Sequence, residues 1–178
     1  TPTLARQVIQ KVRSVTDKPI SHLVLSHYHA VRVLGATEYK ASNIIMSSKA
    51  RSMVVERGQE DWDSEFDRFP RLFKGHEEIP GLTWPTTTFD KKMSLFLGKR
   101  RVDLYFLGRA HTAGDIVIHV PDSNVLFTGD IVEYKSACYC GDAHLQDWPQ
   151  TLGKIAKFQA NSLVPGRGDA LTDPIQID

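Results

Sequence analysis

Short apolar runs bounded by polar residues alternate, in the first half of the chain, with stretches where apolar residues recur every three or four positions. The first pattern is typical of buried strands, and the second of helices that bury one face. The predicted elements are a helix with Leu4, Val8, Ile9 and Val12 on one face, a strand over 20–26, a helix over 30–40 interrupted by Gly35, a strand over 43–47 and a helix over 48–60.

The second half is richer in predicted strands. Strands are expected over 82–89, 93–97, 102–107, 116–120 and 125–127, and then a helix over 149–159 with Leu152, Ile155 and Phe158 on its buried face. The basic run Lys99–Arg101 falls between two of these strands and is interpreted as a hairpin turn. This order of strands and helices predicts an α/β fold.

Residues 61–73 mix aromatic and charged side chains, and two interpretations remain open. The segment is either a cap over a binding cleft or an amphipathic helix that ends before Pro70. A proline removes a backbone donor and restricts the residue before it, so a helix is expected to stop there.

Composition narrows the function classes. The 178 residues, 41% of them apolar, suffice for one globular domain over 1–178 with a sizeable core. The formal net charge of +1 predicts no nucleic-acid partner. No apolar run reaches the ~18–20 residues of a membrane span and no signal peptide is visible, so we expect no membrane association and a cytoplasmic location. The cysteines, Cys138 and Cys140, are interpreted as loop residues, with zinc binding as the alternative.

Two histidines at the end of the first predicted strand are candidate metal ligands. Residues two apart on an extended chain point to the same side, so His27 and His29 are expected to face one point while Tyr28 faces away. Two imidazoles held in this way suit zinc, which takes nitrogen ligands at ~2.0–2.1 Å. A lone His-x-His pair is weak evidence, and its weight depends on further motifs.

Four ordered motifs together resemble the metallo-β-lactamase fold. Residues 26–32 resemble its His-x-His-x-Asp-His signature, and residues 107–115 resemble its Gly-His-Thr-x-Gly turn. Residues 125–130 resemble its Leu-Phe-x-Gly-Asp strand end, and residues 163–168 its Val-Pro-Gly-His-Gly turn. The resemblance implies an αββα sandwich. Relatives normally place several strands before the first helix seen here, so we expect the sandwich to be truncated at its N-terminal sheet.

That truncation has two interpretations. One is that the chain is an internal fragment of a longer protein. The other is that it is complete and forms a homo-oligomer through an exposed sheet edge, because unpaired strand edges invite association.

The resemblance also implies the metal ligands. One metal would be held by His27, His29 and His111, and the carboxylate that usually bridges two metals matches Asp130. Val31, Arg32 and Arg167 occupy positions of the second metal, and neither valine nor a protonated guanidinium binds zinc. We therefore expect one zinc ion, with iron or manganese compatible with the same histidines. Asp130 either stays off the metal, leaving an open catalytic position, or closes a structural site.

The two arginines also have alternative interpretations. Arg32 and Arg167 would form an anion pocket that binds a carboxylate or phosphate of a small-molecule substrate. Alternatively, one of them pairs with Asp130 and fills the position of the lost metal.

Two functions from different classes follow. The first is a mononuclear metal-dependent hydrolase of an ester, thioester, lactone or amide, with Asp130 as a catalytic residue or fourth ligand. The second is a catalytically inactive binding or structural module that has lost its dinuclear site. Retention of all three first-site histidines favours the hydrolase, whereas loss of the second-metal ligands favours the module.

Overall fold

The computed structural model describes residues 1–173. These residues divide into two compact units, and each is described by itself. Unit 1 comprises Thr1–Met46 and Arg51–Thr88, and unit 2 comprises Ser47–Ala50 and the chain from Phe89 onward. The expectation of one domain over 1–178 stays a prediction.

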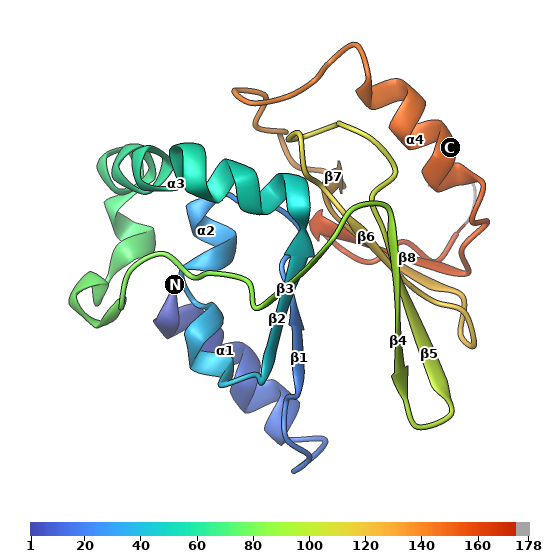
Figure 1. The fold of residues 1–178 in the computed structure, drawn as a ribbon, viewed down its shortest axis with the longest axis horizontal. Coiled ribbons are helices and arrows are strands. Elements are labelled where there is room, and N and C mark those ends of the chain that lie inside the picture. Colours follow the sequence, from blue (N-terminus) through green and yellow to red (C-terminus); the bar gives the residue numbers. More distant parts are fainter. Residues whose placement is uncertain (174–178) are drawn as a thin grey trace. The chain divides into compact units, whose positions relative to one another are not determined.

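Unit 1 combines a small sheet with helices (Figure 1). Its three strands lie in the order β1-β2-β3, and β1 pairs with β2 in parallel. Its elements are α1 (Pro2–Arg13), β1 (His22–Val24), α2 (Ala30–Val33), the 3-10 helix η1 (Ala36–Tyr39), β2 (Asn43–Ser47), α3 (Ser48–Arg68), the 3-10 helices η2 (Pro70–Phe73) and η3 (His76–Glu78), and β3 (Thr87–Phe89). The last residue of β2, the first three of α3 and the last of β3 are counted with unit 2.

The predicted strand over 43–47 is confirmed, but the strand expected over 20–26 contracts to His22–Val24. The predicted interruption at Gly35 is also confirmed, since α2 and η1 are separate helices. A Cβ at Gly35 would lie 2.6 Å from the carbonyl oxygen of Thr1, so the close approach of the N-terminus requires glycine there.

Two helix predictions need correction. Helix α3 runs on to Arg68, so the mixed aromatic and charged segment begins as part of this helix. The interpretation of that segment as a helix ending before Pro70 is confirmed. In α1, by contrast, Leu4 and Val8 are 48% and 49% exposed. The helix buries Pro2 and Ala5, and its expected apolar face is only half covered.

Unit 2 is built on a five-stranded sheet in the order β4-β5-β6-β7-β8. The first four strands are antiparallel neighbours, and β8 pairs with β7 in parallel. A hairpin between β4 and β5 is confirmed at the basic run Lys99–Arg101, but the turn lies at Gly98 and Lys99, and Arg100 and Arg101 already belong to β5. The elements are β4 (Lys92–Leu97), β5 (Arg100–Tyr105), β6 (Val117–Val120), β7 (Val125–Glu133), α4 (Trp148–Ala156) and β8 (Ser162–Arg167).

Helix α4 packs against this sheet through residues spaced as successive helical turns. Trp148, Thr151 and Ile155 are its buried residues, and Ile155 joins Leu126 and Leu163 in one core cluster. Leu152 was expected on the buried face but is 40% exposed. It follows Thr151 by one position, which turns it by about 100° away from the buried stripe.

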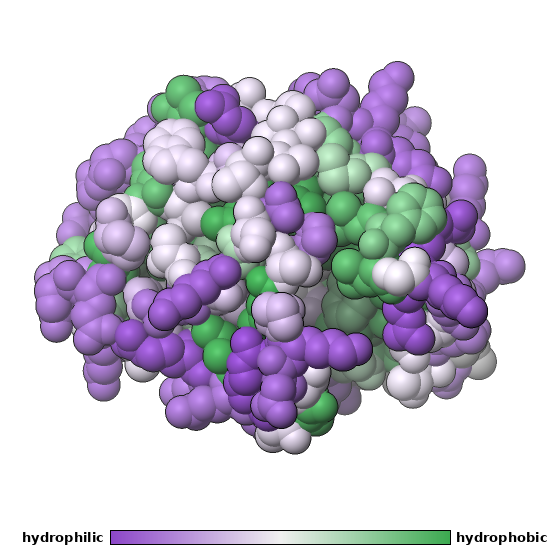
Figure 2. Space-filling model, turned by 60° about the horizontal axis from the view of Figure 1, so that its bottom comes forward, coloured by the Kyte–Doolittle hydropathy of each residue, from purple (hydrophilic) through white to green (hydrophobic). Residues whose placement is uncertain are grey.

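Polar and charged residues dominate the face of the molecule drawn in Figure 2, and apolar residues appear there in separate groups. Among the described residues, every helix is too short or too polar to cross a membrane.

Candidate metal centre

The chain between β1 and α2 positions the first two histidines in unit 1. His27 is fully buried and His29 is 5% exposed, and their ring centroids lie 4.9 Å apart in an edge-to-face arrangement. The hydroxyl oxygen of Ser26 lies 3.0 Å from Nδ1 of His27. Polar partners of this kind orient the rings of metal-ligating histidines.

A carboxylate from α3 holds the turn that follows these histidines. The backbone N–H of Ala30, the first residue of α2, donates to Oδ2 of Asp61 at 2.6 Å. The ring of Tyr28 packs 4.6 Å from that of His29. Asp61 therefore fixes the backbone directly after the second histidine.

His111 lies in unit 2, in a loop after β5 that is stabilised by its own polar groups. Asp115 accepts hydrogen bonds from the N–H and the hydroxyl of Thr112, at 2.7 and 2.8 Å. Burial raises the pKa of the Asp115 carboxyl to about 7, against the opposing effect of these two bonds. The loop is also tied to the last residue of β2, which belongs to unit 2 as well, because the hydroxyl of Ser47 donates to the carbonyl oxygen of Gly114 at 2.6 Å.

Helix α4 anchors the same loop from the other side. Thr151 donates to the carbonyl oxygen of Arg109 at 2.9 Å, and Nζ of Lys154 donates to that of Leu107 at 2.6 Å. The indole ring of Trp148 packs edge to face against the imidazole ring of His111, with their centroids 5.9 Å apart. Gly108 has φ of +146°, and a Cβ there would lie 2.6 Å from Oγ1 of Thr151, so this approach requires glycine.

Asp130 lies near His111 because β7 is irregular at this point. The register between β7 and β8 shifts on both sides of Gly129, and such bulges redirect side chains. Oδ2 of Asp130 lies 3.8 Å from Nε2 of His111, beyond hydrogen-bond range. A Cβ at Gly166 would lie 2.0 Å from Oδ1 of Asp130. The glycine of the motif at 163–168 therefore makes room for the carboxylate.

The two arginines have different surroundings. Nη1 of Arg167 bonds the buried carboxylate of Glu133 at 2.8 Å, and its Nη2 lies 3.7 Å from Oδ2 of Asp130. Arg32 and Val31 belong to α2 and line a cavity of unit 1 together with residues of α1 and β1.

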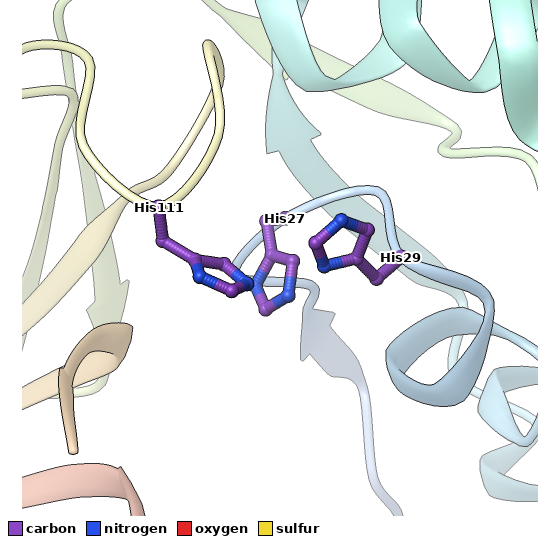
Figure 3. Close-up of side chains that lie close together, drawn as sticks. All are labelled: His27, His29 and His111. Carbon is purple, nitrogen blue, oxygen red and sulfur yellow. The ribbon is translucent and has the colours of Figure 1, made fainter. Parts of the chain in front are cut away.

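His27, His29 and His111 form a His-rich candidate metal site (Figure 3). One ligand atom from each lies within 4.8 Å of the others, and all three side chains are buried. Two ligand nitrogens on a tetrahedral zinc, each ~2.0–2.1 Å from the metal, lie ~3.4 Å apart, which is inside that limit. Buried polar groups are stable when they are hydrogen-bonded or coordinate a metal. Three imidazoles with a carboxylate nearby therefore fit a zinc ion.

A second group of candidate ligands consists of His29, Asp61 and Asp142, with one ligand atom of each also within 4.8 Å of the others. The sequence prediction missed both aspartates. Asp61 lies among several acidic residues of a helix, and no motif distinguishes it from them.

Comparison with known proteins gives the family. A model of the metallo-beta-lactamase superfamily matches residues 2–166. The chain is similar to metallo-beta-lactamase type 2 of Bacteroides fragilis, with 36% identity over 94 residues, covering 50% of this chain and 38% of that protein. It is also similar to metallo-beta-lactamase type 2 of Bacillus sp. (strain 170), with 25% identity over 170 residues, covering 93% of this chain and 58% of that protein. The chain thus spans less than two thirds of the length of both relatives.

Solved structures confirm the fold. A metallo-beta-lactamase from Pontibacter korlensis matches with a TM-score of 0.73 and 20% identity, covering 97% of this chain and 72% of that one. The metallo-beta-lactamase IND-7 matches with a TM-score of 0.69 and 20% identity, covering 92% and 68%. At this identity the likeness shows the fold alone, and it agrees with the predicted α/β class. Since the family model spans nearly the whole chain, the chain belongs to the metallo-beta-lactamase superfamily.

Proposed function

We propose that this chain is a metal-dependent hydrolase with a single zinc ion held by His27, His29 and His111. The observation that carries the proposal is the group of three buried imidazoles whose ligand atoms lie within 4.8 Å of one another. Zinc held by three histidines supplies Lewis acidity, which activates water and polarises a carbonyl group at neutral pH. The substrate class we propose is an ester, thioester, lactone or amide.

Asp130 would act as the proton acceptor. Its Oδ2 lies 3.8 Å from Nε2 of His111, so a water molecule near that histidine is within reach of the carboxylate. In the alternative role, the same carboxylate completes the ligand set. Asp130→Asn separates these roles, because an amide is a poor base and a weak ligand. A lost turnover with unchanged metal content supports the proton acceptor, whereas a lost metal supports the ligand.

We propose that Arg167 in this chain primarily neutralises carboxylates. Its Nη1 lies 2.8 Å from the carboxylate of Glu133 and its Nη2 lies 3.7 Å from that of Asp130, so each terminal nitrogen is within ion-pair distance of one carboxylate. An anion pocket that includes Arg32 and Arg167 remains the alternative. If Arg167→Ala weakens inhibition by phosphate or acetate at least tenfold and leaves the stability of the protein unchanged, the pocket is supported instead.

The competing function is a catalytically inactive binding or structural module. The pairing of Arg167 with Asp130 favours it, because a guanidinium beside this carboxylate opposes a second cation there. In that case the protein keeps the fold and the three histidines but hydrolyses no substrate.

The decisive experiment is metal stoichiometry by plasma mass spectrometry on protein purified without chelators or metal affinity columns, followed by hydrolysis assays. We expect about one zinc per chain, lost in His111→Ala and retained in His119→Ala, a histidine of β6. Hydrolysis of at least one ester or thioester should disappear with the metal. One metal without turnover on any substrate would support the inactive module. Two metals would contradict the single site, and no metal would contradict the metal-dependent hydrolase.

A further inference from the structure

An open apolar cavity of about 430 Å³ in unit 2 is not used by the proposed chemistry. Its apolar walls come from the end of β7 and the start of α4, and they include Ile131, Val132, Leu145, Trp148, Pro149 and Leu152. Leu145 and Leu152 are 62% and 40% exposed at its margin. Cavities of this size and character are typical of sites for small molecules.

The cavity adjoins two of the candidate site residues of unit 2. Ile131 follows Asp130 directly on β7, and Nε1 of Trp148 donates to the carbonyl oxygen of Ile131 at 3.0 Å. That bond fixes the indole, which contacts the imidazole of His111 with ring centroids 5.9 Å apart. Trp148 therefore belongs both to the cavity wall and to the surroundings of His111.

The loop between β7 and α4 makes a second connection. Cys138 and Cys140 line the cavity, and Tyr139 between them lies with its ring 6.3 Å from that of His111. A ligand in the cavity would thus contact Cys138 and Cys140, the two neighbours of Tyr139 in the chain.

The polar margin of the cavity carries little net charge. Burial, together with the charges of Glu133 and Cys140, raises the pKa of the Cys138 thiol, so this group stays neutral at pH 7. The carboxylate of Glu133 also borders the cavity, and it is paired with Arg167 at 2.8 Å. A neutral margin around apolar walls selects uncharged ligand groups over ions.

We propose that this cavity binds the uncharged apolar part of the substrate, an alkyl or aryl group next to the scissile carbonyl. The inference rests on the proposed hydrolase function and extends it to a preference for hydrophobic acyl groups. Burial of each CH₂ of such a group is favourable by about 0.8 kcal/mol, so affinity should rise with chain length until the cavity is full.

Binding is tested first, without any reaction. The probe is N-phenyl-1-naphthylamine, an uncharged dye that fluoresces in apolar surroundings, titrated into the complete chain with its metal. We expect Leu152→Glu, which places a charge at the cavity margin, to weaken binding at least tenfold. The matched control is Leu97→Glu, a similarly exposed leucine at 49% on β4, which should leave binding unchanged.

The cysteines give a second, local readout. Bound probe should slow the reaction of Cys138 and Cys140 with N-ethylmaleimide, measured by mass spectrometry. Equal dye binding by the wild type and Leu152→Glu, or thiols that react equally fast with and without dye, would overturn the proposal.

Hydrolysis then separates this inference from the proposed function. For p-nitrophenyl esters, kcat/KM should rise at least tenfold from acetate to octanoate, and Leu152→Glu should remove that difference. Equal rates across the series would overturn the cavity as the acyl site. If no ester, thioester, lactone or amide is hydrolysed while dye binding still depends on Leu152 and protects the thiols, the proposed function fails and the cavity stands as a ligand site.

Discussion

The hydroxyl of Thr151 donates a hydrogen bond to the carbonyl oxygen of Arg109, 2.9 Å away, and so joins α4 to the loop that carries His111. Thr151 is 1% exposed, so its hydroxyl is shielded from water and depends on this acceptor. The position of a candidate metal ligand is thereby coupled to the packing of a helix that supplies no candidate ligand itself.

Replacement of Thr151 by valine should therefore weaken metal binding. The substitution keeps the shape of the side chain and leaves the carbonyl of Arg109 without this donor, a loss of about 1–3 kcal/mol in the free energy of unfolding. Zinc affinity, measured by chelator competition, should fall. Thr151→Ser keeps the hydroxyl and is the control. Equal zinc affinities in the valine and serine variants would contradict this coupling.

Asp61→Ala should lower both stability and metal affinity, because it removes the acceptor of the Ala30 N–H next to His29. We expect a loss of about 1–3 kcal/mol in the free energy of unfolding. Metal affinity should fall by about 10–100-fold, as when outer partners of ligating histidines are removed. Asp63→Ala, on an exposed position of α3, is the control. Unchanged zinc affinity in Asp61→Ala would show that the turn after His29 needs no support from α3.

Gly166→Ala should displace the carboxylate of Asp130, because the added Cβ would lie 2.0 Å from its Oδ1. Such overpacking costs about 1–3 kcal/mol, and turnover should fall with it. Gly153→Ala in α4 is the matched control, since its Cβ would meet no atom within 4 Å. This control should stabilise the helix by about 0.5–1 kcal/mol. Urea unfolding and ester hydrolysis measure both effects, and a fully active Gly166→Ala variant would be inconsistent with the tight fit.

The carboxyl of Asp103 on β5 should make stability depend on acid pH. Burial favours its neutral form, but hydrogen bonds from Ser94 and Tyr105 and the charges of Lys92 and Arg101 outweigh burial and lower its pKa. A carboxyl with a lowered pKa in the folded state stabilises the fold above its unfolded pKa of about 3.9. That contribution is lost as the pH falls through the folded value.

Urea unfolding between pH 2 and 7 checks this prediction. Asp103→Asn should be less stable than the wild type at pH 7, and the difference should shrink below pH 4. Asp122→Asn, an exposed carboxyl in the turn between β6 and β7, is the control and should follow the wild-type curve. A constant difference between wild type and Asp103→Asn across this range would contradict the assignment.

The sequence alone was sufficient for the fold class and for the family, because both depend on local patterns. His27 and His29 follow an apolar run, His111 lies in a turn with its own hydrogen-bonding residues, and Asp130 ends a strand motif. Each of these features depends on a few neighbouring residues. The hydrophobic periodicity and the order of the motifs along the chain are therefore enough to predict them.

Only the tertiary structure decided which distant groups meet. Arg167 and Glu133 pair across neighbouring strands, Asp61 reaches the turn after His29, and Trp148 packs against His111. Leu152 shows the same limit. Helical periodicity predicts it on the buried face of α4, but the residues that α4 buries are Trp148, Thr151 and Ile155. Periodicity determines which way a side chain faces on its own element, whereas its partner depends on how that element packs in three dimensions.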